Sequence, residues 1–271
     1  MSLAITSDRQ YSLIALDLDG TVLDSSHVMT ERVSLALRQV IERGIHVILV
    51  SSRPPRSVLD IARRINTKNL IVALGGAVVA NQNGDLLNID RATIVRQDVE
   101  KILALSKQHN LTVNFYCGWD WYVDRLDNRV QHEIDIIGFK PQVVKALEQI
   151  DREPEKILLM GEPDSLQNFH HQISQQNLCI STSFSKPTYY EITASNITKS
   201  AALALVCQKL NVSGSATIAV GDNFNDLDML HWAGLGVAMD NAPAEVKAVA
   251  NLTIGSNDED GVAHFVQEVF L

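Results

Sequence analysis

Short apolar runs alternate with helical periodicity over the first third of the chain. The runs at 12–16, 45–50 and 70–74 have the length of strands that are buried on both faces. Apolar positions recur at helical spacing over 31–43, between the first two runs, and a second helix is expected over 57–65. This β-α-β-α-β order predicts a parallel, doubly wound sheet of the α/β class.

The pattern changes after residue 81. The dipeptide Asn83-Gly84 lies between short apolar runs at 78–80 and 86–89, which predicts a β-hairpin. Helical and strand patterns are mixed beyond this point: helices are expected over 95–109, within 130–150 and over 164–175, and strands over 111–117, 156–160 and 178–184. Residues 82–186 are therefore predicted to form an inserted α+β domain.

The last third of the chain returns to the first pattern. Expected elements are a helix over 200–210, a buried strand over 216–220 followed by GDNFND and a helix to about 233, a strand over 236–239 and a helix over 242–250. Because both ends of the chain share this pattern, we predict that residues 1–81 and 187–271 build one Rossmann-like core. The inserted segment would sit over that core as a cap.

Composition and charge narrow the class of protein. Hydrophobic residues make up 46% of the 271 positions, which is enough for a sizeable core. Acidic residues outnumber basic ones by 32 to 23, and the sequence pI is near 5.3. This balance argues against a nucleic-acid partner, because a phosphate backbone calls for a basic face. The apolar runs are far shorter than the roughly 18 residues of a membrane helix, so no membrane partner is expected.

The cysteines and the N-terminal sequence indicate the compartment. MSLAITSDRQ lacks the basic start and long apolar stretch of a signal peptide. The cysteines are scattered and form no CxxC pair, which favours free thiols in a reducing environment; they are Cys117, Cys179 and Cys207. We therefore expect a cytoplasmic protein.

Acidic residues follow two of the expected parallel strands. Asp17 and Asp19 come after the first strand, and Asp222 and Asp226 come after the strand at 216–220. Ligands of open α/β sheets bind beyond these carboxyl ends. Two carboxylates about 4 Å apart repel by roughly 4 kcal/mol at an effective dielectric constant of about 20, so such a group calls for a cation. Oxygen ligands favour Mg²⁺.

Other polar residues near these strand ends suit a phosphoryl group. Lys199 lies at the start of a helix, where the dipole disfavours a cation, so we expect it to have an anionic partner. Ser51 ends the second strand, and its hydroxyl and the nearby N–H groups can hold a phosphate. The set suits phosphoryl transfer through an aspartyl-phosphate, with Asp17 as nucleophile. A second acid, Asp19, would protonate the leaving oxygen and then activate water.

Four segments carry a resemblance to a known family. DLDGT at 17–21, SSR at 51–53, Lys199 and GDNFND at 221–226 resemble, in this order, the four motifs of the haloacid dehalogenase superfamily. GDNFNDLDML is similar to the form found in its Cof-type phosphatases, which carry an α/β cap where this chain has its insertion. The resemblance covers essentially the whole chain, and it implies phosphatase activity and dependence on Mg²⁺.

The resemblance also implies a role for each motif residue. By position, Asp17 would be the nucleophile and a metal ligand, and Asp19 would be the general acid/base and a metal ligand through its main-chain carbonyl. Asp222 would bind the metal directly, with support from Asp226. The phosphate-binding residues would be Ser51, Lys199 and Asn225. Two positions depart from the usual motifs. Ser51-Ser52 replaces Thr-Gly, and Gly75-Gly76-Ala77 stands where Asn-Gly-Ala is common, which removes one amide side chain near the substrate.

We predict a Mg²⁺-dependent phosphatase that hydrolyses phosphomonoesters of small molecules, such as sugar phosphates or phosphorylated cofactors. One alternative is a phosphotransferase such as a phosphomutase, which passes the phosphoryl group to a sugar. A second alternative is a non-catalytic phospho-receiver module, which also uses acidic residues, a hydroxyl and a lysine on a doubly wound sheet. The sequence leaves the individual substrate and the oligomeric state open.

Several other polar or aromatic residues have simpler explanations. Asp24 is expected to cap the loop after the first motif, and His170-His171 to be a surface pair in a helix. Arg53 is either a loop ion pair or a substrate contact, and the sequence does not separate the two. An aromatic cluster is expected in the core or rim of the cap rather than against the substrate: Trp119, Trp121 and Tyr122.

Overall fold

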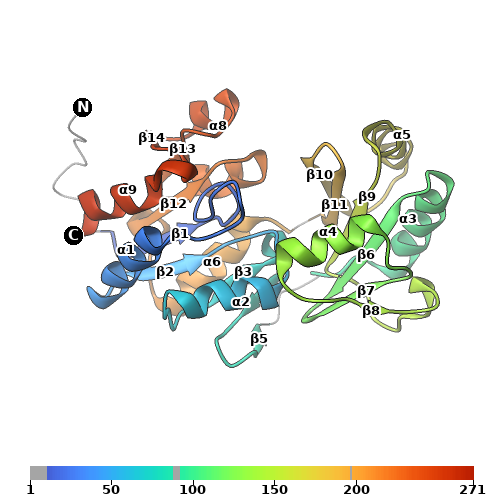
Figure 1. Ribbon diagram of the computed structural model, residues 1–271, viewed down its shortest axis with the longest axis horizontal. Coiled ribbons are helices and arrows are strands. Elements are labelled where there is room, and N and C mark those ends of the chain that lie inside the picture. Colours follow the sequence, from blue (N-terminus) through green and yellow to red (C-terminus); the bar gives the residue numbers. More distant parts are fainter. Residues whose placement is uncertain (1–10, 88–91, 196) are drawn as a thin grey trace.

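The computed structural model describes residues 11–87, 92–195 and 197–271 (Figure 1). Its core is a parallel sheet with the strand order β14-β13-β12-β1-β2. The strands are β1 (Leu13–Leu16), β2 (His46–Leu49), β12 (Thr217–Gly221), β13 (Leu235–Met239) and β14 (Leu252–Ile254). The central ones are apolar at nearly every position because both faces of the sheet are covered.

Helices cover both faces of this sheet. They are α1 (Glu31–Glu42), α2 (Pro55–Arg64), α6 (Lys199–Leu210), α7 (Leu227–Trp232), α8 (Ala244–Val249) and α9 (Gly261–Phe270). Ile14 and Leu16 pack with α1, α2 and α9, whereas Leu13 and Ala15 pack with α6, α7 and α8. Alternate side chains of β1 therefore serve opposite faces. The predicted doubly wound core is confirmed.

The third strand joins the core only loosely. β3 (Ile71–Ala73) meets the core sheet at a single parallel bridge between Val50 and Val72. It pairs along its length with β4 (Val78–Ala80), which pairs in turn with β5 (Leu86–Leu87). The predicted hairpin at Asn83-Gly84 is present, and the end of its expected second strand, 88–89, lies outside the described residues.

A second sheet of six strands forms the other end of the molecule (Figure 1). Its order is β10-β11-β9-β6-β7-β8, and all pairs except β7–β8 are antiparallel. The strands are β6 (Thr112–Cys117), β7 (Asp120–Val123), β8 (Gln142–Val143), β9 (Lys156–Met160), β10 (Ile180–Lys186) and β11 (Tyr189–Ala194). The inserted mixed sheet confirms the predicted fold class.

Each face of the second sheet has its own cover. α3 (Arg96–Gln108) and α5 (Pro163–Ser174) pack on one face, where they bury Phe115 and Ile157. The other face of the sheet is covered by α4 (Asn128–Ile137). Strand side chains on this face, such as Leu158 and Tyr189, belong to the same hydrophobic cluster as side chains of the core. This second face therefore points towards the carboxyl ends of the core strands.

Some elements differ from the prediction. A helix or two were expected to cover roughly 130–150, but α4 ends at Ile137 and is followed by β8 and a single turn of 3₁₀ helix at Leu147–Gln149. Strand pairing also crosses the predicted domain limits: β5 pairs with β4, and β11 pairs with β9 and β10. The division at 82 and 186 therefore stays a prediction.

Among the described residues, no helix has the length and apolar character required to cross a membrane. All three cysteines are free thiols, and two of them, Cys117 and Cys207, are buried. The expectation about a signal peptide concerned residues 1–10, which lie outside the described residues, and the cytoplasmic location stays a prediction.

Candidate active site

Three carboxylates meet beyond the carboxyl ends of β1 and β12. Asp17 follows β1, and Asp222 and Asp226 follow β12, its parallel neighbour in the sheet. One carboxylate oxygen from each of the three lies within 4.8 Å of the others. Asp17 is 6% exposed and Asp226 is fully buried. Residues about two hundred positions apart in the sequence therefore share one buried acidic site.

Lys199 lies between two of these carboxylates. It is the first residue of α6, which begins after the N-cap Thr198. Its Nζ donates to Oδ1 of Asp17 and to Oδ1 of Asp226, both at 2.6 Å. Burial opposes the charge of Lys199, but the two carboxylates outweigh it and raise its pKa above the ordinary value. The expected anionic partner is thus a pair of aspartates.

One lysine does not balance three acidic side chains. Burial, reinforced by the neighbouring acids and opposed by Lys199, raises the pKa of Asp17 well above its usual range. Burial and the nearby Asp226 likewise raise the pKa of Asp222 to about 7. This excess of negative charge on oxygen ligands is what a site for a divalent cation requires.

The loop after β1 closes tightly on the same group. Gly20 has φ +80°, and a Cβ atom at this position would lie 2.3 Å from Oδ2 of Asp222. Thr21 donates its hydroxyl hydrogen to Oδ1 of Asp222 at 3.1 Å. The glycine and threonine of the first motif therefore shape the acidic group directly, and the donor set fits Mg²⁺.

Asp19 faces away from the carboxylate group and towards Arg53. The Nε and Nη2 groups of Arg53 each donate to the Asp19 carboxylate at 2.7 Å, and Nδ1 of His27 lies 2.8 Å from it. Burial alone would raise the pKa of Asp19, but the bonds to Arg53 and His27 lower it below its ordinary value. Arg53 also donates to the carbonyl oxygen of Ile136 in α4 at 3.1 Å. Arg53 therefore forms an ion pair with Asp19 and also lines the cavity between core and cap.

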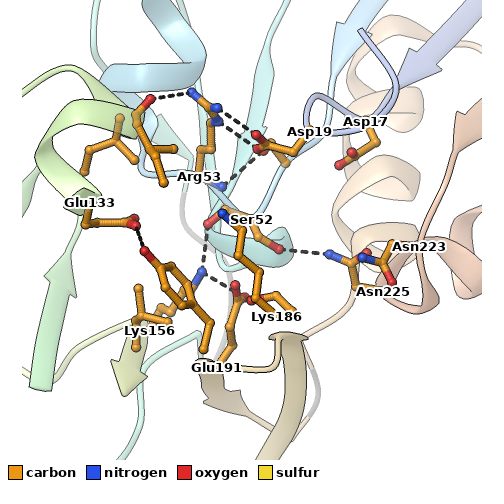
Figure 2. Close-up of a pocket in the computed structure, with 16 residues that line it drawn as sticks. Asp17, Asp19, Ser52, Arg53, Glu133, Lys156, Lys186, Glu191, Asn223 and Asn225 are labelled. Atoms are coloured by element: carbon orange, nitrogen blue, oxygen red, sulfur yellow. Dashed lines mark hydrogen bonds and ion pairs between the residues drawn. The ribbon is translucent and has the colours of Figure 1, made fainter. Parts of the chain in front are cut away.

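The loop after β2 supplies hydroxyl groups. Ser51 is 1% exposed, and its Oγ accepts the N–H of Arg53 at 3.1 Å. Oγ of Ser52 accepts a hydrogen bond from Nδ2 of Asn225 at 3.2 Å (Figure 2). Ser51, Asn225, Asp17 and Asp19 line one cavity of about 110 Å³. All the predicted site residues thus lie at one place, and their chemical roles stay predictions.

Residues from the second sheet close this cavity from the other side (Figure 2). Tyr189 of β11 donates to Oε2 of Glu133 in α4 at 3.0 Å, and Lys156 of β9 forms an ion pair with Glu191 of β11 at 2.8 Å. Burial raises the pKa of Glu133. The sequence analysis missed these residues. For Lys156 and Glu191 a usable signal was the charge that each adds to an otherwise largely apolar strand, KILLM and YYEITA.

The simpler explanation holds for Asp24, whereas of the expected surface pair His171 is exposed and His170 is half-buried. Asp24 accepts the N–H groups of Ser26 and Val28 and closes a turn. Nδ1 of His170 lies 2.8 Å from the hydroxyl of Tyr190 on the far side of the cap.

The aromatic cluster also belongs to the packing of the cap. Trp121 is 1% exposed, stacks on Tyr116 and donates to Asn114 at 3.1 Å. Trp119 is half-buried and donates to the carbonyl of Gly84, and Tyr122 packs against the face that α3 and α5 cover.

Comparisons with known proteins agree with this geometry. The profile of the haloacid dehalogenase-like hydrolase family matches residues 14–266. A Haemophilus influenzae protein named "Putative phosphatase" is 32% identical over 96% of this chain and 98% of its own length. The 5-amino-6-(5-phospho-D-ribitylamino)uracil phosphatase YcsE of Bacillus subtilis is 27% identical, with 96% of each chain covered.

Solved structures extend the comparison to the fold. A haloacid dehalogenase-like hydrolase from Bacteroides thetaiotaomicron superposes with a TM-score of 0.88 and 27% identity, over 96% of this chain and all of the other. The four motifs, the capped α/β fold and these matches lead to one assignment. The chain is a phosphomonoester hydrolase and belongs to the haloacid dehalogenase-like hydrolase family.

Proposed function

We propose that the protein is a Mg²⁺-dependent phosphatase that hydrolyses phosphomonoesters of small molecules through an aspartyl-phosphate on Asp17. The observation that carries this proposal is the meeting of Asp17, Asp222, Asp226 and Lys199 beneath a cavity that the cap encloses. A buried nucleophile beside a lysine and a cation site has the parts that attack on an anionic phosphoryl group needs.

The hydrogen bonds of Asp226 give it a different role from that of the other carboxylates. Oδ1 of Asp226 accepts from Lys199, and its Oδ2 accepts the N–H groups of Asp222 and Asn223, both at 3.0 Å. Both carboxylate oxygens of Asp226 thus already accept hydrogen bonds. The ligands that remain for Mg²⁺ are Asp17, Asp222 and the main-chain carbonyl of Asp19. When bound, Mg²⁺ neutralises charge on the phosphoryl oxygens.

The residues of the chain would act in two steps. A carboxylate oxygen of Asp17 attacks phosphorus and the ester P–O bond breaks, while Asp19 gives a proton to the leaving oxygen. A water molecule then attacks the same phosphorus, its proton passes to Asp19 and the bond to Asp17 breaks. Ser51, Asn225 and Lys199 would hold the phosphoryl oxygens throughout. Arg53 and His27 favour the ionised Asp19 that the second step needs and oppose the protonated form that the first step needs, so Asp19 has to take up its proton away from Arg53.

Small phosphorylated metabolites suit the site. The cap leaves a cavity of about 110 Å³ whose walls carry donors and acceptors, among them Lys156, Glu133 and Tyr189. The relative YcsE is named for a phosphorylated small molecule. Sugar phosphates and phosphorylated cofactors are therefore the substrate classes that we propose.

A panel of small phosphate esters, assayed for inorganic phosphate with and without EDTA, tests the proposal. We expect Mg²⁺-dependent release from at least one ester, its loss with EDTA and its return when Mg²⁺ is added in excess. Transfer of the phosphoryl group to a sugar acceptor without release of phosphate would favour a phosphotransferase instead. A stable phosphoprotein without turnover would favour a receiver module.

A further inference from the structure

Ser52 connects the phosphoryl site to the cap. Its Oγ accepts a hydrogen bond from Nδ2 of Asn225 at 3.2 Å, and its carbonyl oxygen accepts one from Nζ of Lys156 at 2.9 Å. Asn225 belongs to the loop after β12 of the core, whereas Lys156 begins β9 of the second sheet. Figure 2 shows both contacts converging on this one residue. Ser52 is thus bound from both domains.

The contact from Lys156 depends on the position of the cap. Lys156 is 3% exposed, and Glu191, its neighbour on the cap sheet, balances its charge at 2.8 Å. An ammonium group has three N–H donors, and a buried donor without an acceptor is costly. The carbonyl of Ser52 satisfies one of these donors only while the cap lies over the core. The contact therefore exists only in this arrangement of cap and core.

The contact to Asn225 fixes an amide group. One N–H of the Asn225 amide goes to Oγ of Ser52, which leaves the other N–H available to a phosphoryl oxygen. Oδ1 of Asn225 is buried and has no hydrogen-bond partner among the residues that the structure describes. An amide that turned around would present this acceptor to the phosphoryl oxygens and repel them. In this structure the hydroxyl of Ser52 accepts from the amide and so helps to hold the side chain of Asn225 in place.

We propose that Ser52 is a positioning residue that couples cap closure, through Lys156, to phosphate binding by Asn225. This coupling rests on the proposed function, in which Asn225 binds the phosphoryl group. Closure brings Lys156 onto the Ser52 carbonyl and steadies the loop after β2. The steadied hydroxyl then holds the Asn225 amide with its free N–H towards phosphate.

A double-mutant cycle of Ser52→Ala and Lys156→Met tests the coupling. Each variant should raise KM for a small ester, and the dissociation constant of inorganic phosphate measured by calorimetry with Mg²⁺, by about three- to tenfold. The value of kcat should change less than twofold, whereas partial unfolding would lower kcat and leave KM unchanged. The double variant should be less impaired than the product of the single effects.

Lys186→Met is the matched control. Lys186 lines the same cavity from β10, and its Nζ lies over the ring of Tyr189, 5.0 Å from the centroid. Its effect should multiply with that of Ser52→Ala. The coupling is overturned if the effects of Ser52→Ala and Lys156→Met also multiply, or if Ser52→Ala leaves phosphate affinity within twofold of the wild type.

Two further outcomes are separable. If Lys156→Met fails to fold, Lys156→Gln takes its place in the cycle, because Ser52→Ala alone removes only a hydroxyl group and tests the hold on Asn225, not the coupling to the cap. If the wild type releases no phosphate from any ester, the proposed function fails. The dissociation constants of inorganic phosphate measured by calorimetry still test the coupling in that case. A wild type that binds no phosphate overturns both.

Discussion

Asp17, Asp19 and Asp24 lie close together in the sequence but meet three different surroundings. Asp17 is buried between Lys199 and two other acids, Asp19 is bound by Arg53, and Asp24 caps an exposed turn. Residue type alone therefore says little about function. The strand end that precedes an aspartate and the charge that faces it decide what its carboxylate can do.

Replacing Asp17 by asparagine should abolish turnover. The amide keeps the shape of the side chain but has no carboxylate oxygen to attack phosphorus, so we expect kcat to fall by roughly 10³-fold or more. Asp24→Asn, in the same loop, should keep near-wild-type activity. Steady-state phosphate release measures the activity of both variants, and circular dichroism checks that they are folded. An active, folded Asp17→Asn protein would contradict the assignment of the nucleophile.

The pKa of Asp222 makes the stability of the metal-free protein depend on pH. Asp222 titrates near pH 7 in the folded protein and near 3.8 when unfolded, so between these values the folded protein holds a proton that the unfolded chain has lost. The free energy of unfolding should therefore fall as the pH rises from about 4 to 7, by at most about 1.4 kcal/mol per pH unit from this group.

Urea unfolding in EDTA across this pH range measures the effect. Asp222→Asn should flatten the curve, although Asp17 retains a similar dependence, and Asp60→Asn, at an exposed position of α2, should leave it unchanged. Mg²⁺ should stabilise the wild type most above pH 7, where the carboxylates are ionised. A metal-free protein that gains stability as the pH rises through this window would contradict the raised pKa.

The start of α6 depends on a close approach of backbone to backbone. Gly76 has φ +108°, and a Cβ atom here would lie 2.2 Å from the carbonyl oxygen of Thr198, the N-cap of the helix. The Gly75-Gly76 turn after β3 therefore packs directly against the residue that precedes Lys199. A motif that the sequence analysis connected with substrate contacts thus also sets the position of Lys199.

Gly76→Ala should destabilise the protein more than Gly44→Ala. Both positions have positive φ, which costs a residue with a Cβ roughly 1–2 kcal/mol, but nothing lies within 4 Å of a Cβ at Gly44. At Gly76 the overlap adds about 1–3 kcal/mol. Urea unfolding of both variants measures the difference, and equal losses would show that the contact with Thr198 is not tight.

Elements with strong periodicity, a continuous apolar run or a motif at their ends were predictable from the sequence, and strands interrupted by polar residues were not. α1 and β9 agree with prediction to within one residue. β7 and β11 were missed, because polar residues interrupt each of them and they are recognisable only beside their partners in the second sheet. No element was predicted beyond residue 250, where β14 and α9 lie.

The convergence of the motifs was predictable, whereas the wall of the cavity opposite them was not. Parallel strands bring their carboxyl ends to one edge, so Asp17 and Asp222 could be expected to meet. Lys156 and Glu133 reach the cavity only because the second sheet turns one face towards the core. That orientation follows from packing between domains, which no local pattern in the sequence encodes.

The arrangement of cap over core should exclude folded phosphoproteins as substrates. The phosphoryl site lies behind Lys156, Glu133 and Tyr189, and Arg53 joins the core loop to α4 of the cap, so a phosphorylated side chain on a protein surface cannot reach Asp17. We expect phosphate release from small esters at least about a hundredfold faster than from a phosphorylated folded protein, measured as kcat/KM on the same preparation. A tryptic digest of that protein is the control, because short phosphopeptides are less bulky than the folded surface. Comparable rates on the intact protein would show that the cap leaves the site open.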